Sequence, residues 1–158
     1  MQKDLFTPEP LVKSTVAEIE ISYKPRQKAS ELPKVTTAFD AFIYLQTIFP
    51  SIDYREYFYI LCMNRNNKIL GYFQISVGGI SSTVIDVRLI MQVALKSNSS
   101  INILAHNHPS HNLTPSLQDK DITNKIREAG RLLDIPVLDH LIITSENYFS
   151  FANEGLMW

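Results

Sequence analysis

The sequence predicts a single α/β (or α+β) domain built on a mixed β-sheet, and three observations support this fold class. Apolar runs of strand length alternate with longer segments whose apolar residues recur at helical spacing. Some neighbouring runs are joined by short polar turns, which favour antiparallel hairpins, and others are separated by a helical segment, which favours parallel pairing. The chain has 158 residues, 45% of them apolar, which is enough for one domain with its own core.

We expect residues 1–35 to form an N-terminal arm with one strand that packs on the domain, and residues 36–158 to form the domain itself. Alternating apolar and polar residues over 16–23 predict a half-buried strand in the arm. No internal repeat, low-complexity tract or linker divides the rest of the chain. One domain is therefore expected after the arm.

The first helix is expected over residues 38–49. Thr36 and Thr37 supply an N-cap for it, and Pro50 ends it. Helical spacing places four apolar side chains on the face expected to be buried: Phe39, Phe42, Ile43 and Leu45.

A β-hairpin should follow the first helix. The continuous apolar run 57–63, headed by Glu56, predicts a central strand that is buried on both faces. A polar turn at 64–67 leads into a returning strand over 68–77, and residues 81–85 could form a third strand.

The second half of the chain alternates helices and strands. Asp86 is a good N-cap for an amphipathic helix over 87–96, and an apolar run predicts a short buried strand at 101–105. The remaining expected elements are a helix over 116–133 and two strands over 137–144 and 148–151.

Composition excludes several classes of protein. The chain has 15 Lys and Arg against 16 Asp and Glu, so it lacks the basic excess that is typical of nucleic-acid-binding proteins. Its single cysteine, Cys62, excludes a disulfide framework and a multi-cysteine zinc site. The first residues lack the apolar core of a signal peptide, and no apolar run is long enough to span a bilayer. We therefore expect a cytoplasmic protein with no membrane partner.

A candidate metal site follows the strand at 101–105. Alternate residues of a strand point to the same side, so His106 and His108 can present their imidazoles to one point, and Pro109 ends the strand there. Asp119 lies near the first turn of the next expected helix. Two histidines and one carboxylate match the three protein ligands of a catalytic zinc site with one position open.

The residues around these histidines allow other interpretations. A lone histidine on an apolar strand is usually a core residue with one hydrogen bond, but a pair followed by Pro and a downstream Asp is much rarer. A binuclear hydrolase motif of the HxHxDH type would need Asp where Ser110 stands before His111. Zinc deaminases need a Pro-Cys-x-x-Cys pair, which the chain does not contain.

Two further residues fit hydrolytic chemistry at such a site. Glu56 is an acid at the edge of an apolar strand, where a charge serves no packing purpose, and it is the candidate general base. Ser116 lies one turn from Asp119 and could donate a hydrogen bond to a developing oxyanion. Asp139 and His140 could support a ligand from behind, or His140 could be an ordinary core histidine.

These residues resemble the JAMM motif of JAB/MPN metalloprotease domains, and most of all the bacterial RadC-like branch. The motif is a distant Glu, then His-x-His-Pro, six residues, Ser, two residues and Asp. The chain satisfies it with Glu56, His106, His108, Ser116 and Asp119. The resemblance covers about residues 36–155.

The resemblance implies a curved mixed sheet flanked by helices, similar to the cytidine-deaminase layout. It also implies that His106, His108 and Asp119 bind Zn²⁺, that Glu56 acts as general base, and that Ser116 stabilises the tetrahedral intermediate. The expected activity is that of a zinc-dependent hydrolase of JAMM type, which cleaves a peptide or isopeptide bond in a peptide or protein substrate with a metal-activated water.

Two alternatives stay open. One is a catalytically weak JAB-like binding module in a DNA-repair-associated context, and the other is a metal-dependent nuclease. Longer RadC-like members carry an N-terminal helix-hairpin-helix segment thought to suit DNA, whereas this chain has the arm, so the sequence offers little for nucleic acid as a partner. His111 stands where RadC-like chains usually have Gly, and it could reshape the loop or offer an extra ligand.

Overall fold

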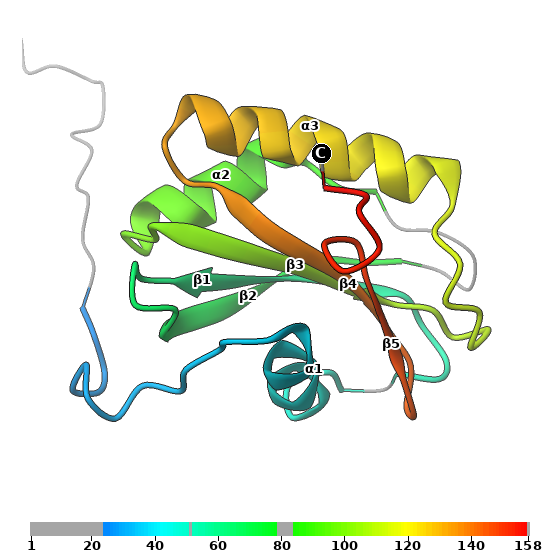
Figure 1. Ribbon diagram of the computed structural model, residues 1–158, viewed down its shortest axis with the longest axis horizontal. Helices are drawn as coiled ribbons and strands as arrows, with labels where there is room; N and C mark the ends of the chain where they lie inside the picture. The colour runs from blue at the N-terminus through cyan, green and yellow to red at the C-terminus, as the bar shows by residue number, and fades with distance from the viewer. Residues whose placement is uncertain (1–23, 51, 79–83, 158) are drawn as a thin grey trace, which may run out of the picture.

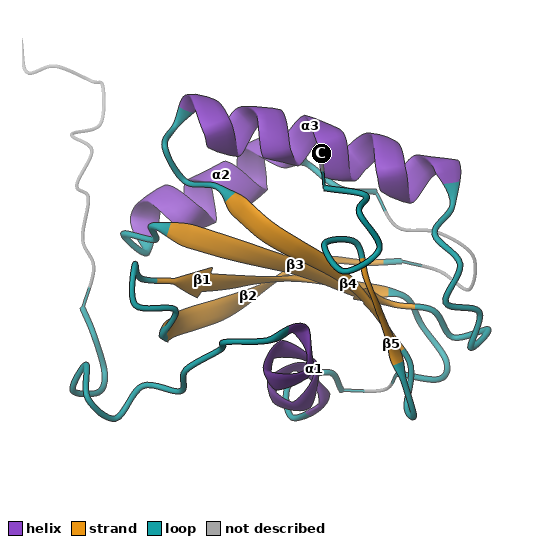
Figure 2. Ribbon diagram, viewed as in Figure 1, coloured by secondary structure: helices purple, strands orange, loops and turns teal. Residues whose placement is uncertain are grey.

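The computed structural model describes residues 24–50, 52–78 and 84–157. A five-stranded sheet with the order β2-β1-β3-β4-β5 forms its centre. Two helices, α2 and α3, cover one face of the sheet, and α1 lies against the other face (Figures 1 and 2). The elements along the chain are α1 (Ala38–Gln46), β1 (Tyr57–Met63), β2 (Ile69–Val77), α2 (Val87–Lys96), β3 (Ile101–Asn107), α3 (Leu117–Leu132), β4 (Val137–Ile143) and β5 (Tyr148–Ser150).

The sheet is mixed, as predicted. Strand β1 pairs antiparallel with β2 and with β3, whereas β3 and β4 are parallel and β5 returns antiparallel to β4. The β1–β2 pair is the expected hairpin, and α3 is the helical crossover that parallel strands require. All seven residues of β1 are buried, which confirms that this strand is covered on both faces.

Two apolar cores lie on opposite faces of the sheet, because successive side chains of a strand alternate between faces. Tyr59 and Leu61 belong to the core that includes α1, whereas Phe58 and Ile60 belong to the core under α2 and α3. Glu56 precedes β1 by one residue and has the same parity as Phe58. The alternation therefore assigns Glu56 to the side of the sheet that α3 covers.

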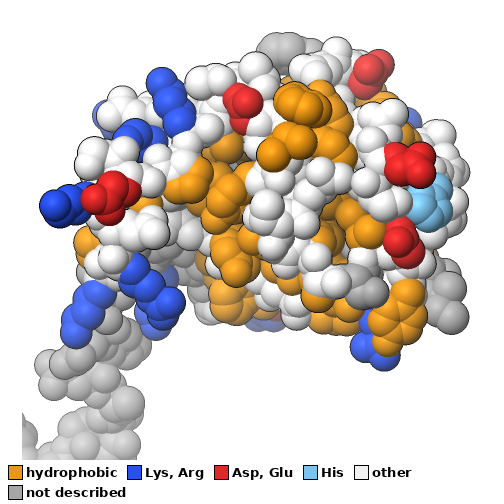
Figure 3. Space-filling model, turned by 90° about the horizontal axis from the view of Figure 1, so that it is seen from below, with side chains coloured by type: hydrophobic (Ala, Val, Ile, Leu, Met, Phe, Trp, Pro, Cys, Tyr) orange, Lys and Arg blue, Asp and Glu red, His pale blue; other side chains and the backbone are white. Residues whose placement is uncertain are grey.

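Helix α1 is shorter than the sequence predicts, because it ends at Gln46 and not at residue 49. The hydroxyl and the backbone N–H of Thr47 both donate to the carbonyl of Tyr44, and this tightens the chain out of the α-helix. Apolar side chains are visible on the face of the molecule that carries α1 (Figure 3). Phe39 and Ile43 stay 55% and 46% exposed, so only part of the expected apolar face is buried.

The remaining differences concern strands. Strand β3 continues to Asn107, two residues beyond the predicted end, because His106 has partners on both sides, Phe58 in β1 and Ile142 in β4. The possible strand over 81–85 falls partly outside the described residues, and Val84 and Ile85 belong to no strand. The strand expected over 16–23 lies wholly outside them. Within the described part of the chain, no helix is both long and apolar enough to cross a membrane.

Candidate metal centre

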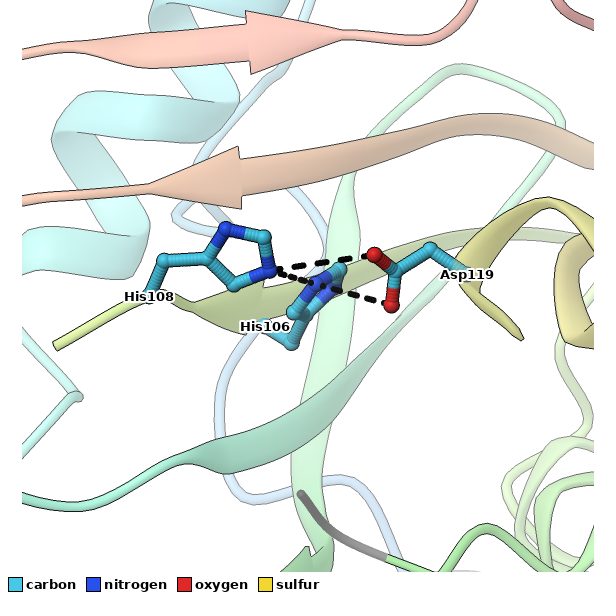
Figure 4. A group of neighbouring side chains, drawn as sticks. All are labelled: His106, His108 and Asp119. Atoms are coloured by element: carbon cyan, nitrogen blue, oxygen red, sulfur yellow. Dashed lines mark hydrogen bonds and ion pairs between the residues drawn. The ribbon is translucent and has the colours of Figure 1, made fainter. Parts of the chain in front are cut away.

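The structure brings the three predicted ligand residues together. His106 lies at the end of β3, His108 just beyond it, and Asp119 in the first turn of α3 (Figure 4). The Nε2 atoms of the two imidazoles are 2.9 Å apart. Asp119 Oδ1 lies 3.3 Å from Nε2 of His106, and its Oδ2 lies 3.8 Å from Nε2 of His108. One potential ligand atom from each residue therefore faces a common point.

A chain of hydrogen bonds defines the tautomer of His106. The hydroxyl of Thr123 donates to the backbone carbonyl of Asp119, so its oxygen is left to accept from Nδ1 of His140 at 2.6 Å. The Nε2 atom of His140 then carries no hydrogen, and it accepts from Nδ1 of His106 at 2.8 Å. A neutral His106 therefore has its hydrogen on Nδ1 and a free lone pair on Nε2.

His108 reaches the same state by a different partner. Its Nδ1 contacts the backbone carbonyl of Asn112, and because a carbonyl can only accept, Nδ1 must carry the hydrogen. In a neutral ring with its hydrogen on Nδ1, the Nε2 atom is free to bind a cation. Both lone pairs face each other beside the carboxylate of Asp119.

This donor set fits a bound cation. Three electron-rich atoms converge, and a hydrogen between the two Nε2 atoms would require one ring to be an imidazolium. Burial disfavours that charge on His106, and it lowers the pKa of this residue to about 4. Two neutral imidazole nitrogens and one carboxylate oxygen are ligands that suit Zn²⁺.

Ser116 orients the carboxylate. It is the N-cap of α3, and its oxygen accepts from the backbone N–H of Asp119 at 3.1 Å. In return, Asp119 Oδ2 accepts from the hydroxyl of Ser116 at 2.6 Å and from its backbone N–H at 2.7 Å. This capping box fixes Oδ2 and leaves Oδ1 directed at His106. The predicted oxyanion role of Ser116 stays a prediction, and it would require the hydroxyl to turn away from Asp119.

Glu56 stands beside the ligands although it precedes them by about fifty residues. The pairing of Phe58 with His106 brings the start of β1 to the end of β3. Glu56 is half-buried and lines the same cleft, of about 760 Å³, as His108 and Asp119. Burial raises the pKa of Glu56, its electrostatic interaction with His108 lowers it, and its interaction with Asp119 raises it. The carboxylate is thus within electrostatic reach of the candidate ligands.

His140 supports His106, which is one of the two roles that the sequence left open. It is fully buried between Phe58 and Phe151, and its ring stacks on that of Phe151 with centroids 4.7 Å apart. Burial places the pKa of His140 well below its usual value, so the ring is neutral and can accept from His106. Asp139 accepts from the backbone N–H of His140, and so it holds the strand that presents this ring.

Two participants were missed by sequence reasoning. Thr123 follows Asp119 by one helical turn, and this spacing, together with a nearby buried histidine, is the signal that could have found it. Asn112 acts through its backbone carbonyl, so its side-chain type gives no signal. His111 does not join the ligand group. It adopts φ 58°, a left-handed conformation that glycine favours, and its ring lies 3.5 Å from Asp53.

The mixed sheet, its helical layers and the convergent His-His-Asp group define a JAB-type domain with a candidate metal centre. Residues 35–156 match the family model described as the RadC-like JAB domain, and the chain belongs to this family.

Known relatives agree with this family membership. A UPF0758 protein from Flavobacterium johnsoniae is 43% identical over 90% of this chain and 62% of its own length. Those from Porphyromonas gingivalis and Chlorobium chlorochromatii are 39% and 32% identical, over 91% and 90% of this chain and 64% of their own lengths. The chain thus spans less than two thirds of the length of these relatives.

Proposed function

We propose that the protein is a zinc-dependent hydrolase of JAMM type that cleaves a peptide or isopeptide bond. One observation carries the proposal. The Nε2 atoms of His106 and His108 converge with a carboxylate oxygen of Asp119, and a second, half-buried acidic residue, Glu56, lines the same open cleft. A purely structural site would have no need of that second acid.

Each residue then has a defined task. His106, His108 and Asp119 hold Zn²⁺, which when bound activates a water molecule and polarises the substrate carbonyl. Glu56 takes the proton of the attacking water on its carboxylate and passes it to the leaving amine, and its raised pKa suits this exchange. Ser116 turns its hydroxyl away from Asp119 and donates from Oγ to the oxygen that becomes negative.

The cleft favours a peptide or protein as the substrate. Its volume of about 760 Å³ lies within the range of ligand sites, and its walls combine apolar Phe58, Ile85 and Ile122 with polar groups. Among the described residues that line it, Lys125 is the one Lys or Arg, against the acidic Glu56, Asp119 and Asp121. Because a nuclease needs cationic contacts to phosphate, this lining supports peptide cleavage over the nuclease alternative. The proposal includes a cytoplasmic location, in line with one buried cysteine and no disulfide framework.

The first test is the metal content of protein purified without chelator, measured by elemental analysis. We expect about one zinc per chain in the wild type and almost none in the His106→Ala/His108→Ala variant. A screen of peptide and isopeptide substrates follows, with Glu56→Gln as a variant that keeps its zinc and loses activity. If folded wild-type protein holds no metal and does not bind added Zn²⁺, the hydrolase proposal fails and the binding module becomes the better account.

A further inference from the structure

Asn107, the residue between the two histidines, uses its whole side chain to hold the turn before β1. It is fully buried, and alternation along β3 directs it away from the face to which His106 points. Its Oδ1 accepts from the backbone N–H of Tyr57 at 2.7 Å. Its Nδ2 donates to the carbonyls of Ile52 and Arg55, each at 2.6 Å. Two donated bonds and one accepted bond also fix which way round the amide sits.

These hydrogen bonds bracket Glu56. The carbonyl of Arg55 belongs to the peptide group before Glu56, and the N–H of Tyr57 belongs to the peptide group after it. The carbonyl of Glu56 itself accepts from the backbone N–H of Gly78 at 2.8 Å. The backbone on both sides of Glu56 is therefore held, and its side chain can leave the cleft only by rotating its own torsions.

The side chain of Asn107 links β3 to the turn before β1, beyond the point where the two strands pair. Pairing between β1 and β3 stops at Phe58 and His106. Beyond that point, the turn that carries Glu56 would have no backbone partner on β3, and the amide of Asn107 takes that place. The segment 106–108 thus presents two candidate ligands on one side of the sheet, and on the other side its central residue holds the backbone of the turn that carries Glu56.

We propose that Asn107 is a positioning residue, which fixes Glu56 beside the metal ligands. This inference rests on the proposed function, since it concerns the base of that reaction. Only an amide of this length supplies two donors and one acceptor to the turn. Ser is too short to reach all three backbone groups, and Asp would set a carboxylate against two carbonyl oxygens.

The experiment compares Asn107→Ser with Asn107→Asp in the full chain. Asn102→Ser is the matched control, because Asn102 is an equally buried Asn on β3 that contacts Ser99 and not the turn. Three quantities are measured: the zinc content, the ¹³C carboxyl signal of Glu56 in Co²⁺-loaded protein, assigned by its loss in Glu56→Gln, and kcat and KM once a substrate is known.

We expect the Asn107 variants to keep their zinc, to lose much of the paramagnetic shift of the Glu56 carboxyl, and to lose roughly 100-fold in kcat with little change in KM. The Asn102 variant should match the wild type in all three. Because the carboxyl signal needs no substrate, it tests the placement of Glu56 even if no peptidase activity is found.

Three results would overturn the inference. One is an unchanged Glu56 signal in a folded, Co²⁺-loaded Asn107 variant. The second is loss of zinc from the Asn107 variants but not from the Asn102 control, which would mean that Asn107 acts on the ligands. The third is an equal effect of both asparagines, which would mean that any buried Asn on β3 serves only the stability of the fold.

Discussion

At His106, His108 and His140, the placement of one hydrogen on each ring decides what the site can bind. Each of these rings has a neighbour that settles this placement, and the neighbours of His106 and His140 form one continuous chain that begins at a backbone carbonyl. The hydroxyl of Thr123 starts this chain, because it donates to the carbonyl of Asp119 and so must accept from His140. The side chain of Thr123 thus influences the lone pair of a histidine that it does not contact.

Thr123→Val should weaken zinc binding. Valine keeps the shape of the side chain but leaves the Nδ1 hydrogen of His140 without an acceptor in a fully buried position. We expect the free energy of unfolding to fall by about 1–3 kcal/mol, and zinc affinity to fall by about 10–100-fold. Competition with a chelator of known affinity measures the second effect. Thr123→Ser keeps the hydroxyl and should resemble the wild type, and equal zinc affinity in the Val and Ser variants would contradict the tautomer argument.

At the scale of the secondary-structure elements, the capping residues at the helix N-termini can have a second role besides starting the helix. Both α1 and α3 open with a full capping box, and in α3 the acid of that box is also a candidate ligand. Ser116 therefore both caps α3 and binds the carboxylate of Asp119, and substitutions can separate these two roles.

Ser116→Ala and Ser116→Gly separate the cap from the contact with Asp119. The Ala variant should lose about 1 kcal/mol of stability, whereas the Gly variant should lose only a few tenths. Both lose the hydroxyl that binds Oδ2 of Asp119, so both should bind zinc more weakly by a similar factor. Chemical denaturation and zinc titration provide the two measurements. If the Gly variant binds zinc nearly as well as the wild type and only the Ala variant is weaker, then zinc affinity depends on the capping of α3 and not on the contact with Asp119.

The capping box of α1 predicts a pH effect. Hydrogen bonds from Thr36 and Thr37 lower the pKa of Asp40 from 3.8 to about 2. A carboxyl whose pKa is lower in the folded state contributes stability above its unfolded pKa, and that contribution is lost as the pH falls from 3.8 towards about 2. As the pH is lowered from above 3.8 towards 2, the denaturant concentration at the unfolding midpoint should therefore fall more steeply for the wild type than for Asp40→Asn. Parallel curves would mean that the box adds no pH-dependent stability.

At the scale of the whole molecule, apolar periodicity and turn residues were enough to predict the mixed sheet and the order of the described helices and strands, apart from the possible strand over 81–85. These features depend on which residues are buried, and the spacing of apolar residues along the chain indicates burial without knowledge of long-range contacts. The end of α1 was predicted wrongly because the bonds of Thr47 to Tyr44 compete with the last helical turn, and a Thr there is not by itself a stop signal.

The sequence predicted some features of the candidate site and not others. His106, His108 and Asp119 could be placed together because they lie on one strand end and the next helix start. The nearness of Glu56 depends on the register between β1 and β3, which no local pattern records. The tautomers of the histidines depend on contacts of Thr123 and Asn112 across the core, and these were beyond reach for the same reason.

Bound zinc should stabilise the whole fold. A ligand that binds only the native state adds about 2.7 kcal/mol when its free concentration is 100 times its Kd. We expect the Tm of the wild type to rise with added Zn²⁺ and to fall on treatment with a chelator. The His106→Ala/His108→Ala variant should show neither shift, and a similar shift in that variant would indicate binding elsewhere on the chain.

The crossover β3-α3-β4 has a consequence for how the site assembles. His106, Asp119, Thr123 and His140 all come from this one contiguous stretch, whereas Glu56 arrives with the β1–β2 hairpin. A locally opened chain can therefore keep the hydrogen bonds of the ligand cluster while the hairpin is undocked, since none of these hydrogen bonds involves a residue of the hairpin. If the protein is the proposed zinc hydrolase, metal binding and hydrolysis would then depend on different parts of the fold, and a chain with its hairpin undocked would hold zinc without being able to cleave its substrate.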